Sequence, residues 1–145
     1  MTSVIFLLLF NFMNVAQSED AAFSVRIRLL KPIVTTVVQP LSFPDTMAGS
    51  SSSVVVSSTA DSAAQVDVQG GANRTIHSYV VENSIAMTSP SSSSNVRVDG
   101  FSVKSPTAFD STGKAKLSVG ATAHILASNE DANYAGNATL RVIYQ

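Results

Sequence analysis

The sequence of 145 residues contains no cysteine and no tryptophan, and it has only two histidines. Without cysteine, disulfides, thiolate catalysis and Cys-ligated zinc or iron–sulfur centres are excluded. Nine Lys and Arg residues nearly balance ten Asp and Glu residues, so the chain offers no basic field for a nucleic-acid backbone or an anionic lipid surface. We therefore expect no nucleic-acid partner.

Helical patterning is also missing, because no long stretch places apolar residues at i, i+3, i+4 and i+7. What the chain has instead is 23 Ser and 11 Thr, against only 13% charged residues. Small and β-branched hydroxyl residues fit a pleated surface well. Short β-like runs alternate with turn-forming clusters, and this pattern predicts an all-β sandwich of seven to nine strands.

The β-like runs differ in length and phase. They cover residues 33–38, 54–56, 64–68, 76–81, 96–98, 101–103, 115–126 and 140–144. The alternation changes phase between Val98 and Phe101, which predicts a bulge or turn at Gly100. The serine cluster at 89–94, with Pro90, predicts a loop.

The first 18 residues are uncharged and contain an apolar run at 4–10. This run is too short to cross a hydrocarbon core of about 30 Å, and Ala16-Gln17-Ser18 fits a small-x-small cleavage site. We expect residues 1–18 to be a secretion signal that is cut before Glu19.

The segment after Glu19 and Asp20 alternates with period two. Phe23, Val25, Ile27 and Leu29 fall on one face of an extended strand, with small or cationic residues between them. Pro32 then ends the ladder, because it has no N–H to donate. We predict a strand with one apolar face, which either opens the domain's own sheet or pairs with another molecule.

Motifs for chemistry are scarce. The nucleophile elbow, the Walker loop and the H-E-x-x-H pattern are all missing. His77 and His124 have no partner at ligand spacing, and we interpret both as strand-face histidines. The loop from Asp131 to Gly136 lacks two oxygen ligands of a calcium loop, so we interpret it as a turn. We expect no catalytic site, no metal and no cofactor.

Five pieces of the sequence match a family pattern. They are LKPI at 30–33, PLSF at 40–43, QVDVQG at 65–70, LSVGATA at 117–123 and YAGNATLRVIYQ at 134–145. With these, the chain resembles the bacterial pilin-like proteins of the archaic chaperone–usher kind. It is most similar there to an uncharacterised fimbrial-domain family related to the spore-coat-U-like secreted pilins.

The resemblance implies an all-β, immunoglobulin-like sandwich over residues 32–145 that is incomplete and is completed by a donated N-terminal strand. The donor would be segment 19–31 of an identical or related subunit, with Phe23, Val25, Ile27 and Leu29 as its knobs. Strands carrying Leu41, Phe43, Leu140, Val142 and Tyr144 would flank the receiving groove. A periplasmic chaperone and an outer-membrane usher would assemble such subunits head-to-tail into a fimbria on the bacterial surface, for adhesion or biofilm formation.

Two other interpretations remain open at this stage. The first is a monomeric secreted binding module, in which segment 19–31 completes the sheet of its own chain. The second is a secreted hydrolase, which would need a convergent Ser/His/Asp site that the sequence does not reveal. The path of residues 19–31, in cis or across to a neighbour, discriminates the monomeric module from the pilin subunit.

Overall fold

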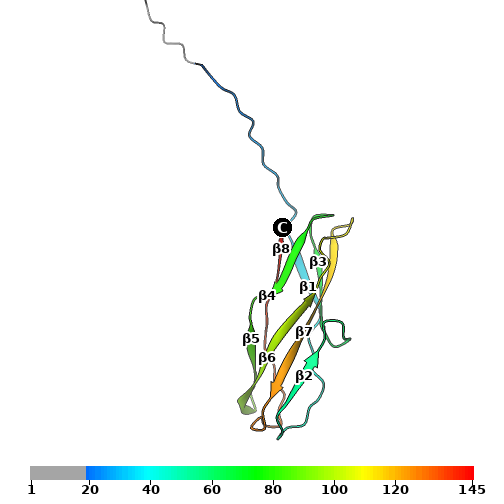
Figure 1. The fold of residues 1–145 in the computed structure, drawn as a ribbon, viewed down its shortest axis with the longest axis vertical. Coiled ribbons are helices and arrows are strands. Elements are labelled where there is room, and N and C mark those ends of the chain that lie inside the picture. Colours follow the sequence, from blue (N-terminus) through cyan, green and yellow to red (C-terminus); the bar gives the residue numbers. More distant parts are fainter. Residues whose placement is uncertain (1–18) are drawn as a thin grey trace, which may run out of the picture.

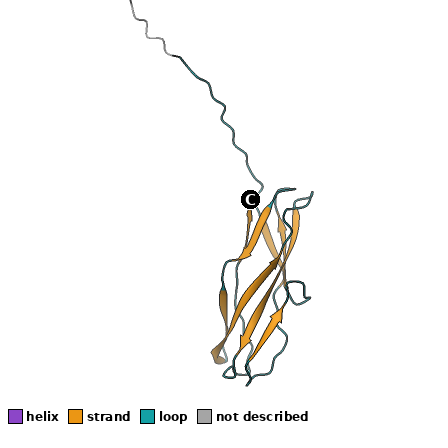
Figure 2. Cartoon of the chain, in the orientation of Figure 1, coloured by secondary structure: helices purple, strands orange, loops and turns teal. Residues whose placement is uncertain are grey.

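The computed structural model describes residues 19–145, which form only strands, turns and loops. The predicted secretion signal at 1–18 lies outside the described residues. The described residues contain eight strands, whose arrangement is drawn in Figures 1 and 2. They are β1 (Val34–Gln39), β2 (Ser52–Val56), β3 (Ala64–Gln69), β4 (Ile76–Val80), β5 (Ser84–Ser89), β6 (Ser92–Lys104), β7 (Lys114–Ile125) and β8 (Leu140–Tyr144).

The strands form two antiparallel sheets. The larger has the order β1-β3-β7-β6-β5, with β2 also paired to β7, and the smaller consists of β4 and β8 alone. The order β1-β3-β7-β6 corresponds to the ABED sheet of an immunoglobulin-type sandwich, and β4-β8 corresponds to C and F of its CFG sheet. The predicted all-β class is confirmed. Within residues 19–145 no strand pairs with β8 on the side opposite β4.

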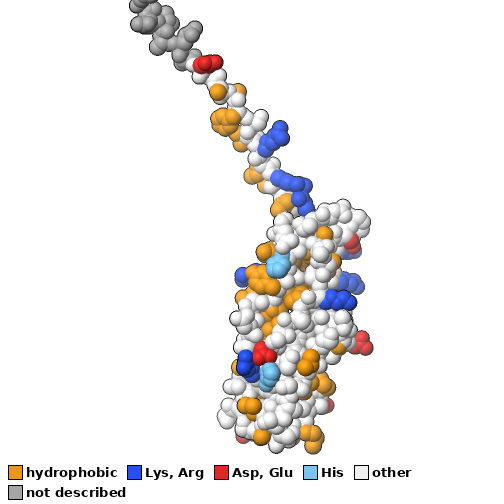
Figure 3. All heavy atoms as spheres, viewed as in Figure 1, with side chains coloured by type: hydrophobic (Ala, Val, Ile, Leu, Met, Phe, Trp, Pro, Cys, Tyr) orange, Lys and Arg blue, Asp and Glu red, His pale blue; other side chains and the backbone are white. Residues whose placement is uncertain are grey.

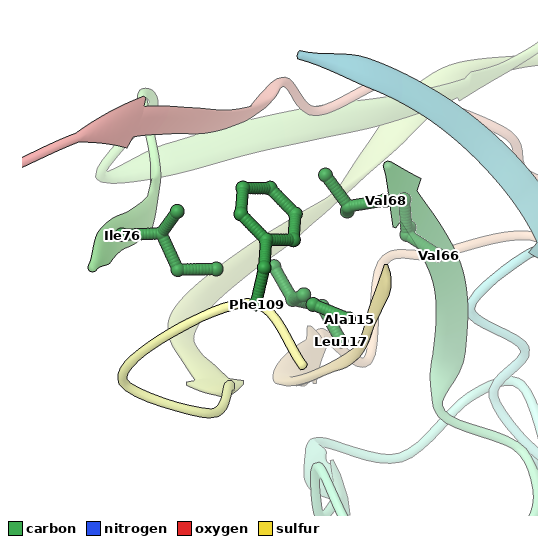
Figure 4. Packing of buried hydrophobic residues seen from close by; sticks show 6 residues of the cluster. All are labelled: Val66, Val68, Ile76, Phe109, Ala115 and Leu117. Atoms are coloured by element: carbon green, nitrogen blue, oxygen red, sulfur yellow. The ribbon is translucent and has the colours of Figure 1, made fainter. Parts of the chain in front are cut away.

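Two apolar clusters fill the space between the sheets. One is centred on Val68, Phe109 and Leu117, each at most 2% exposed. In Figure 4 the Phe109 ring lies between Ile76 and the valines of β3. The second cluster, Val96, Val98, Ala121 and Ala123, occupies the other half of the sandwich. Strict alternation along β3 and β7 supplies most of these side chains.

Several local expectations can be compared with the strands. The register between β6 and β7 shifts between Asp99 and Ser102, and Gly100 has a φ of +62° there, so the predicted bulge is confirmed. The predicted serine loop is wrong in extent, because β5 runs to Ser89 and β6 begins at Ser92. Within this turn the Ser89 hydroxyl accepts from Ser91 N and contacts the Ser91 hydroxyl at 3.1 Å. Strand β5 was not predicted, since its mix of Ala, Met and Thr lacks a β-branched run.

Segment 19–31 is called the tail from here on, and residues 32–145 are called the body. The tail leaves the body at the end where β8 stops (Figure 1). The sequence predicted a strand here, but the tail forms no ladder with the described chain. A strand needs a neighbour to bond its backbone, and none lies beside it. Figure 3 shows hydrophobic and cationic side chains along the tail. Below, the upper end of the body is the end with Tyr144, and the lower end carries the loop at 129–134.

Candidate strand-binding groove

Within residues 19–145, β1 and β8 each have one edge without a partner strand, and both strands line the same cavity. β1 pairs only with β3, and β8 pairs only with β4. No Cα atom of β1 lies within 8 Å of a Cα atom of β8. Neighbouring strands lie about 4.8 Å apart, so the two edges are too far apart to bond directly. The separation leaves the lane between them open.

The backbone groups that face this lane follow from the ladders. Val81 N donates to Thr139 O and Gln145 N donates to Thr75 O, so the odd-numbered residues of β8 bond to β4. In an antiparallel ladder alternate residues direct their N–H and C=O to the same side. The backbones of Leu140, Val142 and Tyr144 therefore face the lane.

The backbone groups of β1 that face the lane follow from its ladder with β3. Gly70 N donates to Gly113 O, which directs the even-numbered residues of β3 to β7 and the odd-numbered ones to β1. Val34 and Thr36 pair with Gln69 and Asp67 of β3. The backbones of Thr35 and Val37 are left to face the lane, opposite β8.

An apolar groove of about 450 Å³ occupies the lane. Thr35 and Val37 line it from β1, and Leu140 lines it from β8. Its floor contains the buried side chains of Val66, Val98 and Val119 from the larger sheet. A site with an apolar floor and free donors and acceptors along both walls suits an extended peptide, whose backbone can bond on each side.

The five residues predicted to flank such a groove are only partly brought together. Leu41, Phe43 and Leu140 line it. Val142 and Tyr144 instead pack against the upper core cluster, although their strand forms the wall. Leu41 and Phe43 do not belong to a strand, contrary to the prediction, because they lie in the connection from β1 to β2 between Pro40 and Pro44.

The predicted knobs on the tail are far from being core residues of this chain. Phe23, Val25, Ile27 and Leu29 are each 83–86% exposed. Their alternation with Ser24, Arg26 and Arg28 gives the extended tail one apolar side. Four large apolar side chains on an exposed segment form a surface that a partner could bury.

The root of the tail is tied to the end of β8. The Tyr144 hydroxyl donates to Lys31 O at 2.6 Å and accepts from Gly71 N at 2.7 Å. Gly70 lies directly beneath, where a Cβ would meet the Phe109 ring and the Tyr144 hydroxyl at 2.4–2.7 Å. Only glycine fits at position 70, and the Tyr144 hydroxyl fixes the point at which the tail leaves the body.

One polar cluster was not found in the sequence. His124 on β7 contacts Asp99 on β6 through Nε2 at 2.7 Å, and Ser53 on β2 through Nδ1 at 3.2 Å. Arg97 forms an ion pair with Asp99 at 2.9 Å. The hydrogen bond from His124 lowers the pKa of Asp99 below its usual value. The residues come from three strands, so only the pairing register could have revealed them.

The cluster has the residue types of a Ser/His/Asp triad, but it lies on a partly exposed sheet face, and none of its side chains lines the groove. It links three strands by polar contacts, and catalysis would additionally need donors placed for an oxyanion. Within residues 19–145 no group of three or more His, Cys, Asp or Glu side chains could hold a metal ion. The same residues contain no helix of the length and apolarity needed to cross a membrane.

The fold and the groove define a class: a small all-β domain of two antiparallel sheets, with an open lane beside its last strand. The family described as Domain of unknown function (DUF4402) matches residues 33–144, and the chain belongs to that family. No curated protein and no solved structure gives a significant match. The matched range begins at Ile33, so it leaves out the tail.

Proposed function

We propose that this chain is a structural subunit of a bacterial surface fimbria that polymerises by donor-strand exchange, with the tail of one copy filling the groove of the next. One observation carries the proposal: the body has an open apolar lane between two unpaired strand edges, while the chain's own apolar strand-like segment leaves the body unpaired. A groove and a matching segment on one chain generate a head-to-tail contact that does not close, and such a contact builds a fibre.

The energetic scale fits a durable polymer. Burying four apolar side chains contributes about 1.5–3 kcal/mol each, or about 6–12 kcal/mol together. Backbone hydrogen bonds to the two open edges add about 1 kcal/mol each. This gain is comparable with the stability of a whole domain, about 5–15 kcal/mol. A subunit with an empty groove would be much less stable than one in a filament, and it would need a periplasmic chaperone and an usher for secretion and assembly.

The direction of the strands separates insertion in cis from insertion in trans. The Tyr144–Lys31 hydrogen bond places the start of β1 beside the end of β8, so these two strands run in opposite directions (Figure 1). A tail that folded back on its own chain would form a hairpin antiparallel to β1 and parallel to β8. A tail from another copy is free to lie antiparallel to β8. In the structure the tail extends away from the body, which favours the second arrangement.

The test is a single charge on the apolar side of the tail. Ile27→Asp would place a carboxylate in an apolar groove and abolish polymers, while the body still folds because Ile27 is 85% exposed. Ser24→Asp is the matched control, since it adds the same charge on the opposite side of the tail. Electron microscopy and light scattering of the secreted protein report filament length. Normal filaments from Ile27→Asp would overturn the proposal.

A further inference from the structure

The groove continues toward the lower end of the body. A second cavity of about 530 Å³ adjoins it there, and both are lined by Phe43 and Met87. Its remaining apolar wall includes Ile125 and Tyr134. Because they share these residues, the two cavities lie next to one another. We call the second cavity the lower mouth.

Three carboxylates stand at the lower mouth: Asp45, Glu130 and Asp131. None of them forms an ion pair with a described residue, because the two ion pairs within residues 19–145 both belong to Asp99. No Lys, Arg or His lines this cavity. The mouth therefore presents uncompensated negative charge next to the apolar groove.

The loop that carries two of these carboxylates is held in place. The Asn129 side chain is 6% exposed, accepts from Leu126 N and donates to Asn95 O. The Tyr134 hydroxyl donates to Glu130 O and contacts Ser94 at 2.6 Å. The position of the negative charge is thus set by the fold before any partner arrives.

The tail has the opposite charge pattern along its length. Arg26, Arg28 and Lys31 lie toward its root, and Glu19 and Asp20 lie at its tip. The tail has 13 residues, about 43 Å when extended. Strand β7, which runs from Lys114 at the upper end to Ile125 at the lower mouth, has 12. A tail laid along the whole groove would therefore place its two charged ends at opposite ends of the body.

Only one direction matches charges at both ends. With its root at the lower mouth, the tail brings Arg28 and Lys31 closest to the three carboxylates. Its acidic tip then reaches the upper end, where Arg74 lies close to Gly71 and Lys114 follows Gly113, the partner of Gly70. The Asp110 carboxylate at this end already accepts hydrogen bonds from Thr112 N and Lys114 N. The reverse direction would set the acidic tip against Glu130 and Asp131, which repel it.

We infer that the lower mouth is a docking site for the cationic root of the tail of a second copy of this chain, and that it sets the direction of insertion antiparallel to β8. This docking site rests on the proposed function, and it adds the charged feature that selects the partner. Opposite charge near the mouth steers the incoming tail and fixes its register, whereas the apolar knobs supply most of the affinity. The effect weakens with salt, because the screening length is about 10 Å at 0.1 M.

The binding experiment uses the full-length chain carrying Ile27→Asp, whose own tail cannot act as a donor, and a fluorescent synthetic peptide of residues 19–31. Charge reversal in the peptide, Arg28→Glu with Lys31→Glu, should weaken binding about three- to tenfold at low salt. Reversal in the acceptor, Glu130→Lys with Asp131→Lys, should restore it. Asp61→Lys, an exposed carboxylate outside the mouth, is the control and should restore nothing.

The outcomes separate the two proposals. If the natural peptide binds and every charge variant binds equally well, the docking site is overturned and the proposed function stands. If the natural peptide does not bind at all, the proposed function falls as well. A peptide with Phe23→Asp tests the apolar contribution independently of the charges.

Direction can be read separately, because the chain has no cysteine of its own. An Ala132→Cys variant carries a label at the lower mouth, since Ala132 lines it. Energy transfer to a dye on the peptide should be strong from the C-terminal end and weak from the N-terminal end. The opposite ranking would overturn the inferred direction.

Discussion

Two regions of the sandwich differ in how their strands are paired: the middle of the larger sheet, and the opening between β1 and β8. Around β7, hydrogen-bonded neighbours lie on both sides, and side chains such as Leu117 and Ala123 are at most 2% exposed. Around β1 and β8, each strand has one partner and one bare edge, and Val37 is 68% exposed. The same alternating pattern thus gives a closed core in one place and an open groove in another. What differs is whether a neighbouring strand is present.

The largest effect is expected from a substitution in the closed core around β7. Leu117→Ala removes a side chain that is 2% exposed, and it should lower the free energy of unfolding by about 2–5 kcal/mol. Val37→Ala on the open edge should cost less than about 0.5 kcal/mol in the monomer, because little burial is lost. Urea denaturation of both variants checks this. Equal losses would mean that the open side is as well packed as the closed side.

The next largest effect concerns the groove itself. Leu41→Asp places a charge on its wall, and binding of the tail peptide should fall by at least tenfold because the carboxylate would be desolvated. Val55→Asp is the matched control, since Val55 is 70% exposed on β2 and lies outside the groove. Fluorescence titration gives both affinities. A similar loss from the control would contradict a role specific to the groove.

A smaller change sharpens the comparison at the upper end. Tyr144→Phe keeps the ring but removes the hydroxyl that serves Lys31 O and Gly71 N. We expect a loss of about 1–2 kcal/mol in unfolding free energy, with faster hydrogen exchange at the Gly71 amide. If exchange at Gly71 is unchanged, the hydrogen bond from Gly71 N to the Tyr144 hydroxyl does not protect this amide.

The smallest expected effect is a loss of stability at acidic pH. Hydrogen bonds lower the pKa of three carboxyls: Glu82 chiefly from Thr139 N, Asp99 from His124, and Asp110 from Lys114 N. A carboxyl with a lowered folded pKa stabilises the fold above its unfolded pKa of about 4, and this contribution is lost as pH falls through the folded pKa. The melting temperature should therefore drop between about pH 5 and about pH 2.

A matched pair of variants tests whether the Asp110 carboxyl causes this loss of stability. Asp110→Asn should flatten the acid slope, because its carboxylate accepts from Thr112 N and Lys114 N. Asp61→Asn, at an exposed position without such bonds, should leave the slope as it is. A slope unaffected by Asp110→Asn would mean that other groups control acid unfolding.

Much of this architecture could be predicted, because it rests on local patterns. The alternation in β3 and the phase change at Gly100 each reflect a side-chain period of two, which is visible in the sequence. The pairing of β4 with β8, and so the empty lane beside β8, could not be predicted in the same way. It depends on contacts between segments about 60 residues apart. Leu41 and Phe43 lie outside any strand because they are flanked by Pro40 and Pro44, which have no N–H to donate to a ladder.

The polar features follow the same rule. Ser53, Asp99 and His124 meet only because β2, β7 and β6 pair in one register. The carboxylates of the lower mouth come from two loops, which carry no periodic pattern. By contrast, the four large apolar side chains of the tail are visible in the sequence as a set, because they alternate within seven consecutive residues.

The central claim is that the body is a sandwich with one strand missing and that the tail can supply it. The most direct measurement is the melting temperature of a chain of residues 32–145, with and without a peptide of residues 19–31. The account predicts a rise of more than ten degrees, because several kcal/mol of binding energy are linked to folding. A truncated chain that is already stable and does not respond to the peptide would contradict it.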